Sequence, residues 1–159
     1  MSNPLHIPFE RFPDADELPP DEQELLRAAL EATELAYAPY SRFQVGCAVQ
    51  LLDGEVLTGN NQENVAYPSG LCAERTVLYY CGAQGKGDQL VKMAIRARSS
   101  QAAIVQPVPP CGACRLVMFE YERMSGRDIV VLMQGESGEV LRVTGVAKTL
   151  LPFSFDIEF

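Results

Sequence analysis

The apolar residues that follow position 24 recur with the period of an α-helix. They fall on one side of a helix that ends before Pro39: Leu25, Leu26, Ala29, Leu30, Ala32, Leu35 and Ala36. Asp21 and Glu24 have the spacing of a capping box at the start of this helix. Residues 1–20 are rich in proline and acidic residues, and we expect them to form an extended N-terminal extension to a domain that spans residues 21–159.

Runs of apolar and β-branched residues predict five strands, at positions 44–52, 55–59, 90–97, 129–133 and 140–143. Asp53-Gly54 joins the first two strands, and the glycine-containing segment 135–138 lies between the last two, as is typical of hairpins. Further helices are predicted at 72–81 and 111–122, with a short one at 146–150. Helices that alternate with strands indicate a layered α/β domain, and the two hairpins require a mixed sheet.

The composition fits one folded domain that acts on a small molecule. The chain has 159 residues, of which 47% are hydrophobic and 21% charged. The net charge of -8 argues against nucleic acid and anionic membrane surfaces as partners. The first residues lack a basic start followed by an apolar run, and the longest uncharged stretch, 99–114, contains prolines and is too short to cross a bilayer. We therefore expect no export, no membrane association and a cytoplasmic location.

Histidine chemistry is nearly excluded, whereas cysteine chemistry is not. His6 is the only histidine, which argues against a Ser-His-Asp hydrolase and against a histidine-based zinc protease. The chain has five cysteines. An odd number without a signal peptide indicates reduced thiols, used for metal binding or catalysis ahead of disulfides.

Three of the cysteines have a spacing that suits one metal ion. Cys111 and Cys114 form a C-x-x-C pair, which alone leaves zinc binding, a redox dithiol and core packing equally open. Cys72 is the candidate third ligand, because it lies at the start of another predicted helix. Three thiolates and one Zn²⁺ leave a charge of -1, which Arg75 could offset; the alternative for Arg75 is a surface salt bridge.

Glu74 turns this metal site into a catalytic hypothesis. A structural zinc ion normally has four protein ligands, and the remaining cysteines, Cys47 and Cys81, fit better as small buried hydrophobic residues. An open coordination position beside a carboxylate is suited to activating a water molecule and moving its proton.

These motifs resemble those of the short, homotetrameric, zinc-dependent class of cytidine deaminases. The resemblance rests first on Cys72-Ala73-Glu74-Arg75 and on residues 110–115, Pro-Cys-Gly-Ala-Cys-Arg. It extends in the same order over about residues 25 to 155, through segments 38–46, 59–64, 67–68 and 150–152. The resemblance implies a three-layer α/β/α fold with a mixed five-stranded sheet, in a cytidine deaminase-like catalytic domain.

The resemblance also implies a reaction and a cofactor. One zinc ion per chain would be held by Cys72, Cys111 and Cys114, with water in the fourth position and Glu74 as the proton carrier. The expected reaction is hydrolysis of cytidine and deoxycytidine to uridine, deoxyuridine and ammonia, a step of pyrimidine salvage. The expected partners are a free cytosine nucleoside and water, without an organic cofactor.

Substrate contacts follow from the same comparison. Asn61 and Glu63 are two residues apart in an extended segment, so their side chains point the same way and suit ribose hydroxyls; in the family this pair binds the 3′-hydroxyl. Phe43 would pack against the nucleoside; the alternative for an aromatic residue at this position is a place in the core. Tyr67 and Phe155 resemble residues that reach a neighbouring subunit's site, which implies a homotetramer with shared active sites.

Other functions remain possible on the sequence alone. A deaminase for another cytosine-containing small molecule is one, although Asn61 and Glu63 favour an ordinary nucleoside. A nucleic-acid deaminase is disfavoured by the charge of -8. A catalytically silent zinc protein is the third, and the intact Glu74 argues against it. The sequence departs from the family pattern at Leu116, Pro109 and Val65, none of which is a catalytic group.

Overall fold

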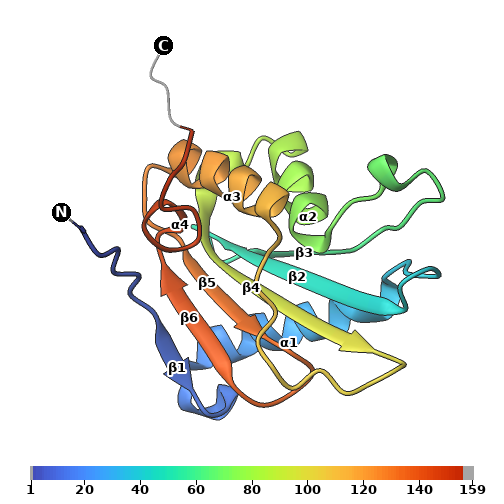
Figure 1. Cartoon of the computed structure of the whole chain (residues 1–159). Helices are drawn as coiled ribbons and strands as arrows, with labels where there is room; N and C mark the ends of the chain where they lie inside the picture. Colours follow the sequence, from blue (N-terminus) through green and yellow to red (C-terminus); the bar gives the residue numbers. More distant parts are fainter. Residues whose placement is uncertain (1, 156–159) are drawn as a thin grey trace.

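A single mixed β-sheet forms the centre of the molecule (Figure 1). The computed structural model describes residues 2–155. The strand order across the sheet is β1 (Glu10–Phe12), β6 (Val140–Thr144), β5 (Val130–Gln134), β4 (Leu90–Ser99), β2 (Phe43–Leu51) and β3 (Val56–Asn60). Only β4 and β5 run parallel, and the other neighbouring strands are antiparallel, which confirms the mixed sheet.

Helices cover both faces of the sheet, so the predicted three-layer α/β/α arrangement is confirmed (Figure 1). Helix α1 (Pro20–Ala32) covers one face, and α2 (Ala73–Ala83), α3 (Gly112–Ser125) and α4 (Val146–Thr149) cover the other. Short 3₁₀ turns are formed at Ala15–Glu17, Thr33–Leu35, Tyr67–Ser69 and Gly87–Gln89. Within the described part of the chain, no helix is long and apolar enough to cross a membrane.

The two hydrophobic cores arise from the alternation of side chains along each strand. In β2, Cys47 and Val49 pack toward α2 and α3, whereas Ala48 packs toward α1. Met93 and Ala94 of β4 divide in the same way between the two cores. Both cores are buried because the central strands are covered on both faces.

Two glycines allow the helices to pack directly on strand backbone. A Cβ atom on Gly46 would lie 1.9 Å from the carbonyl oxygen of Ala29 in α1, and one on Gly59 would lie 2.8 Å from the backbone nitrogen of Val77 in α2. A side chain at either position would force the helix away from the sheet. The contact at Gly59 holds α2 close to β3, and α2 begins beside Cys72.

The sheet has six strands instead of the predicted five. The additional strand, β1, lies within the N-terminal extension and pairs with β6, with Glu10 opposite Arg142. Its three residues are too few to show a hydrophobic alternation, and its pairing depends on a strand that is far away in sequence. All five predicted strands are confirmed as β2 to β6, and so are the predicted helices that follow α1. The ends of these elements differ from the predicted ones by a few residues.

The predicted capping box at Asp21 and Glu24 is wrong. Helix α1 begins at Pro20 with Pro19 as its N-cap, because proline suits the first position of a helix, where its missing N–H is not needed. Asp21 lies inside the first turn, and its carboxylate accepts a hydrogen bond of 2.6 Å from Lys92. That hydrogen bond is the main reason why the pKa of Asp21 is lowered from its ordinary value.

A buried carboxylate joins the N-terminal extension, α1 and the sheet. Glu22 of α1 is only 1% exposed and pairs with Lys92 of β4 at 2.9 Å and with Arg142 of β6 at 3.1 Å. Arg142 also contacts Glu10 of β1 at 2.5 Å. Glu22 is thus the buried member of a network in which Lys92 also pairs with Asp21, and Arg142 with Glu10.

Replacement of Glu22 with alanine is expected to lower the free energy of unfolding by ~3 kcal/mol, because it leaves two partly buried cations without their buried partner. Urea denaturation at a fixed protein concentration measures this loss. Glu24→Ala is the matched control, because the ion pair that Glu24 makes within residues 2–155 is with Arg27, on the exposed side of the same helix. Its loss should cost ~0.5 kcal/mol or less. Equal effects of the two substitutions would contradict a structural role for the buried network.

Candidate active site

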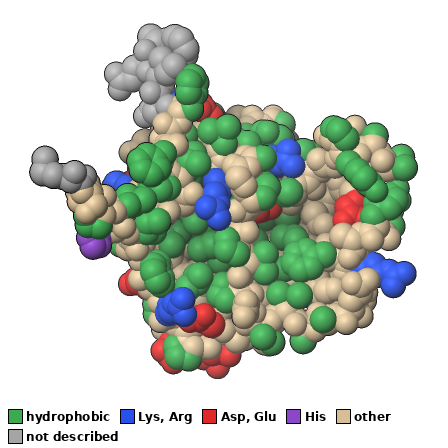
Figure 2. Space-filling view, in the orientation of Figure 1, with side chains coloured by type: hydrophobic (Ala, Val, Ile, Leu, Met, Phe, Trp, Pro, Cys, Tyr) green, Lys and Arg blue, Asp and Glu red, His purple; other side chains and the backbone are tan. Residues whose placement is uncertain are grey.

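A cavity of about 780 Å³ lies between the N-terminal ends of α2 and α3, the start of β2 and the segment after β3. Figure 2 shows a hollow on this face, with apolar side chains around much of it. The cavity brings together most of the side chains predicted from sequence: Phe43, Asn61, Glu63, Tyr67, Cys72, Glu74, Arg75 and Cys111. Cys114 lies buried beside Cys111.

Three thiols converge at one side of this cavity. Cys72 is the N-cap of α2, Cys111 is the N-cap of α3, and Cys114 lies in the first turn of α3. The Sγ atoms of Cys72 and Cys111 are 3.9 Å apart, those of Cys111 and Cys114 are 3.4 Å apart, and all three lie within 4.8 Å of one another. Sulfur ligands placed at ~2.3 Å around one tetrahedral zinc ion are separated by roughly 3.8 Å, so these thiols fit a zinc ion.

The surroundings of the thiols favour negative charge on sulfur. Both helices direct their positive N-terminal ends toward the cluster. The pKa of the Cys72 thiol is lowered to about 5, first by a hydrogen bond from Cys114 and then by contact with Arg75. The same hydrogen bond, together with burial, raises the pKa of the Cys114 thiol. Metal binding requires the thiolate form, which this environment favours at Cys72.

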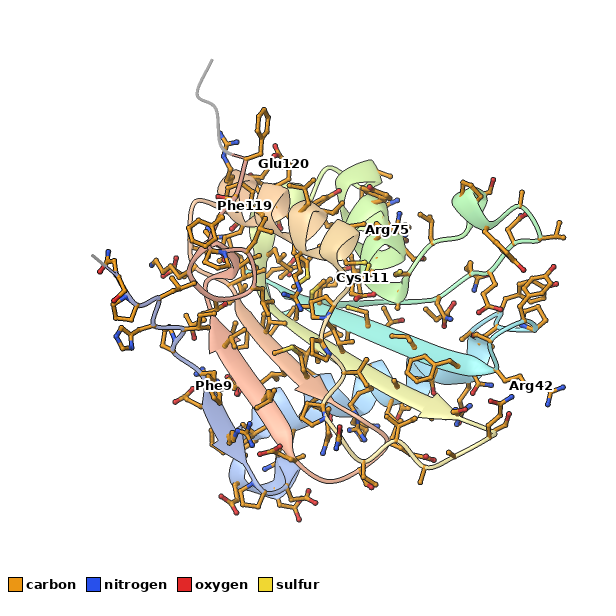
Figure 3. The ribbon with its side chains drawn as sticks, viewed as in Figure 1. Phe9, Arg42, Arg75, Cys111, Phe119 and Glu120 are labelled. Carbon is orange, nitrogen blue, oxygen red and sulfur yellow. The ribbon has the colours of Figure 1, made fainter. Side chains whose placement is uncertain are left out.

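Arg75 contacts the cluster directly. Its guanidinium Nη2 lies 3.6 Å from the Sγ of Cys72, and Figure 3 shows Arg75 and Cys111 at adjacent ends of α2 and α3. Among the described residues, Arg75 is paired with sulfur and not with a carboxylate, in contrast to the alternative of a surface salt bridge. A cation in this position reduces the negative charge of a three-thiolate site.

Glu74 is held in the cavity wall one residue before Arg75. Its side chain is only 4% exposed, and burial raises its pKa, with a further contribution from the charge of Cys72. A carboxylate with a raised pKa accepts a proton more readily than an exposed carboxylate. The arrangement therefore places a carboxylate that can accept a proton beside the candidate metal site.

Asn61 and Glu63 lie on the cavity wall near Phe43, and both are hydrogen-bonded to the main chain. The Oδ1 of Asn61 accepts a hydrogen bond from the Val45 amide at 2.8 Å, and its Nδ2 donates to the Phe43 carbonyl at 2.9 Å. Glu63 Oε2 accepts hydrogen bonds from the amides of Tyr40 and Ser41 at 2.9 and 3.3 Å. These contacts fix the directions of both side chains at the cavity.

Tyr67 and Phe155, the aromatic residues predicted to reach a neighbouring subunit's site, are differently placed. Tyr67 is 79% exposed at the rim of the cavity, where its ring meets the edge of Tyr40 with 6.4 Å between ring centroids. Phe155 is 76% exposed and does not line the cavity of its own chain. Cys47 and Cys81 are buried in the core, as predicted.

Ser41 also lines the cavity, although the sequence pattern of segment 38–46 assigned it no role. Its hydroxyl contacts Glu63, and it accepts a hydrogen bond of 3.1 Å from the amide of Phe43. Serine hydroxyls commonly bind the amide two residues further along the chain, so the sequence itself indicates the contact with the Phe43 amide. The contact with Glu63 links residues that are 22 positions apart and has no such signal.

Comparisons with known proteins agree with this geometry. Residues 19–133 match the family described as cytidine and deoxycytidylate deaminase zinc-binding region. The chain is 41% identical over 138 residues to the cytidine deaminase of Halalkalibacterium halodurans, a match that covers 87% of this chain and 96% of that protein. It is 37% identical over 138 residues to the cytidine deaminase of Sporosarcina psychrophila, a match that covers 87% of this chain and 93% of that protein.

Solved structures give the same result for the fold. The crystal structure of cytidine deaminase from Burkholderia pseudomallei superimposes with a TM-score of 0.72 at 36% identity, covering 83% of this chain and 97% of that chain. The Mycobacterium tuberculosis enzyme superimposes with a TM-score of 0.64 at 32% identity, covering 84% of this chain and 96% of that chain. Because the three-thiol cluster lies within the matched zinc-binding region, the sequence, the fold and the site agree, and the chain belongs to the cytidine deaminase family.

Proposed function

We propose that this protein hydrolyses the C4 amine of cytidine and deoxycytidine, which yields uridine or deoxyuridine and ammonia, as a step of pyrimidine salvage. The observation that supports this most strongly is the cluster of three thiols at zinc-binding distances with the buried Glu74 beside it in one cavity. The similar bacterial proteins are cytidine deaminases, which supports the same reaction here.

Cys72, Cys111 and Cys114 would hold the zinc ion, and Arg75 would offset part of their negative charge. Zinc, when bound, lowers the pKa of a water molecule and so supplies a nucleophile at neutral pH. Glu74 takes the proton of the attacking water and passes it to N3 of the cytosine ring. Once the remaining hydroxyl has added to C4, Glu74 takes the proton of that hydroxyl and delivers it to the amine, which departs as ammonia while the C4 carbonyl of the product forms. Its raised pKa suits a group that accepts and releases protons in turn.

The rest of the cavity would hold the nucleoside in position. Phe43 packs against the substrate, and Asn61 and Glu63 bind the 3′-hydroxyl of the sugar. This assignment is supported by their common place on the cavity wall and by the hydrogen bonds that fix Asn61 and Glu63. A neutral nucleoside needs no cationic phosphate site, which agrees with the net charge of -8.

We also propose a homotetramer in which neighbouring subunits complete each active site. The high exposure of Tyr67 and Phe155 supports this proposal, because large aromatic side chains exposed to solvent are suited to contact with another subunit. A cytoplasmic location is supported by the five cysteines, which are all free thiols.

The purified protein is expected to contain about one zinc ion per chain and to form uridine from cytidine and deoxyuridine from deoxycytidine. Elemental analysis measures the metal, and chromatography of the products measures the reaction. A zinc-containing preparation that converts neither nucleoside would refute the proposed activity and favour another cytosine compound or a silent zinc protein.

Glu74→Gln is expected to keep the zinc ion and to lower kcat by about 10²-fold or more, because the amide cannot accept a proton but fills the same space. Metal content, thermal stability and kcat should be measured on the same preparation. Cys81→Ser is a control for mutation of a nearby core position, since Cys81 lies outside the thiol cluster and should retain both zinc and turnover. Nearly full activity of Glu74→Gln would remove Glu74 from its proposed role.

Sizing in solution is expected to show a tetramer, and two inactive variants should complement each other. Phe155→Ala removes an aromatic residue that we propose acts in a neighbouring site, whereas Glu74→Gln removes a group that acts in its own site. Assemblies obtained by co-expression of both variants should exceed the mean activity of the two parents, because some sites then combine an intact Glu74 with a neighbour's intact Phe155. No gain over that mean, or an active monomer, would contradict shared sites.

A further inference from the structure

The turn that leads into β2 is held in a conformation that needs support. Arg42 has a φ angle of 55° and, among the described residues, is the only non-glycine residue with a positive φ. Its amide donates a hydrogen bond of 3.0 Å to the Ala38 carbonyl, and its own carbonyl accepts one of 3.1 Å from the Ser99 hydroxyl. Residues in this conformation persist where the surroundings determine it, and they are common beside functional sites.

Ser41 connects this turn to the cavity. Its hydroxyl donates a hydrogen bond to Oε1 of Glu63 and accepts one of 3.1 Å from the amide of Phe43. Because the Arg42 side chain projects away from the sheet into solvent (Figure 3), the main chain and Ser41 make the contacts on the cavity side of this turn. A single hydroxyl therefore links the main chain of Phe43 to the carboxylate of Glu63.

We propose that Ser41 is a positioning residue that aims the Glu63 carboxylate, and through it the nucleoside's 3′-hydroxyl, and that it thereby makes the site selective for a sugar with a hydroxyl at this position. The proposal rests on the function proposed above. Ser41 itself need not touch the substrate, since it acts through Glu63.

The hydrogen-bonding capacity of Glu63 supports this role. A carboxylate oxygen accepts two hydrogen bonds. Oε2 already accepts two, from the amides of Tyr40 and Ser41, and Oε1 accepts one, from the Ser41 hydroxyl. Oε1 is thus the atom with capacity for a further donor in the cavity. Partial burial alone would raise the pKa of Glu63, but these hydrogen bonds outweigh it and lower the pKa, so the group remains an acceptor.

The orientation of Asn61 supplies the complementary half of the site. Its Oδ1 is used by the Val45 amide, and one N–H of its Nδ2 is used by the Phe43 carbonyl. The second N–H of the same amide remains available to donate to a substrate. Asn61 therefore donates where Glu63 accepts, and a hydroxyl, which both donates and accepts, matches this pair.

Ser41→Ala would remove the one side-chain donor to Oε1 among the described residues and leave the Glu63 carboxylate held only through Oε2, so that the direction of Oε1 is less firmly fixed about the soft last torsion. The loss should appear only with substrates whose 3′-hydroxyl reaches Glu63. Deoxycytidine and 2′,3′-dideoxycytidine differ in that hydroxyl alone, so together they isolate its contribution.

We expect Ser41→Ala to lower kcat/KM for deoxycytidine about tenfold, mainly through KM, because one hydrogen bond to a charged group is lost from the support of the binding site. For 2′,3′-dideoxycytidine, kcat/KM should remain within about twofold of the wild-type value. The inhibition constant of 2′,3′-dideoxycytidine, measured with cytidine as the substrate, gives a second measure of binding. Ser41→Thr retains the hydroxyl and should restore the discrimination between the two nucleosides.

Ser99→Ala is the matched control. Ser99 supports the same turn through the Arg42 carbonyl but has no contact with Glu63. If Ser41 acts only by stiffening the turn, Ser41→Ala and Ser99→Ala will show the same ratio of kcat/KM for deoxycytidine to kcat/KM for 2′,3′-dideoxycytidine. The proposal expects Ser99→Ala to change both nucleosides by the same factor.

The outcomes separate this inference from the proposed function. An equal loss on both nucleosides for Ser41→Ala, no loss on either, or failure of Ser41→Thr to restore discrimination would overturn the role of Ser41 while leaving the deaminase activity intact. A wild-type enzyme that converts neither cytidine nor deoxycytidine would refute the proposed function itself.

Discussion

The meeting of two helix N-termini at one end of the sheet is the constraint on which the site depends. Cys72 and Cys111 each occupy the last position before a helix, so two positive helix ends and three thiols share one small volume. Thiolates concentrated in this way would repel one another without a cation. Helix α2 packs closely on Gly59, and this backbone contact in the core holds one of the two helix ends in place. The geometry of the metal site therefore depends on a contact outside the site.

The side chains proposed to bind the sugar also hold the wall of the cavity together. Asn61 bridges the main chain of Phe43 and Val45, and Glu63 closes the turn that contains Ser41. A side chain already held by the protein loses little conformational freedom when a substrate binds. The internal hydrogen bonds of these residues are therefore consistent with substrate contact, because they fix the direction of the remaining donor and acceptor.

Much of the fold and of the metal cluster could be predicted because both depend on local patterns. The central strands show alternation, and C-x-x-C and Cys-Ala-Glu-Arg are contiguous motifs. What could not be predicted depends on contacts between distant residues. Strand β1 is defined by its pairing with β6, and Ser41 is defined by its contact with Glu63. The prediction of a capping box was wrong because the helix already begins at Pro20. Asp21 lies inside the first turn and pairs with Lys92 of the sheet.

The short strand β1 determines which backbone groups are exposed at one edge of the sheet. It covers the backbone N–H and C=O groups on the outer side of β6, and its own length is only three residues, with Glu10 ion-paired to Arg142. A short, charged edge is a poor template for a strand from another chain, whereas an uncovered β6 would offer a longer one. Strand β1 therefore gives this side of the sheet a shorter and more charged edge than β6 alone would, which disfavours edge-to-edge pairing with another chain.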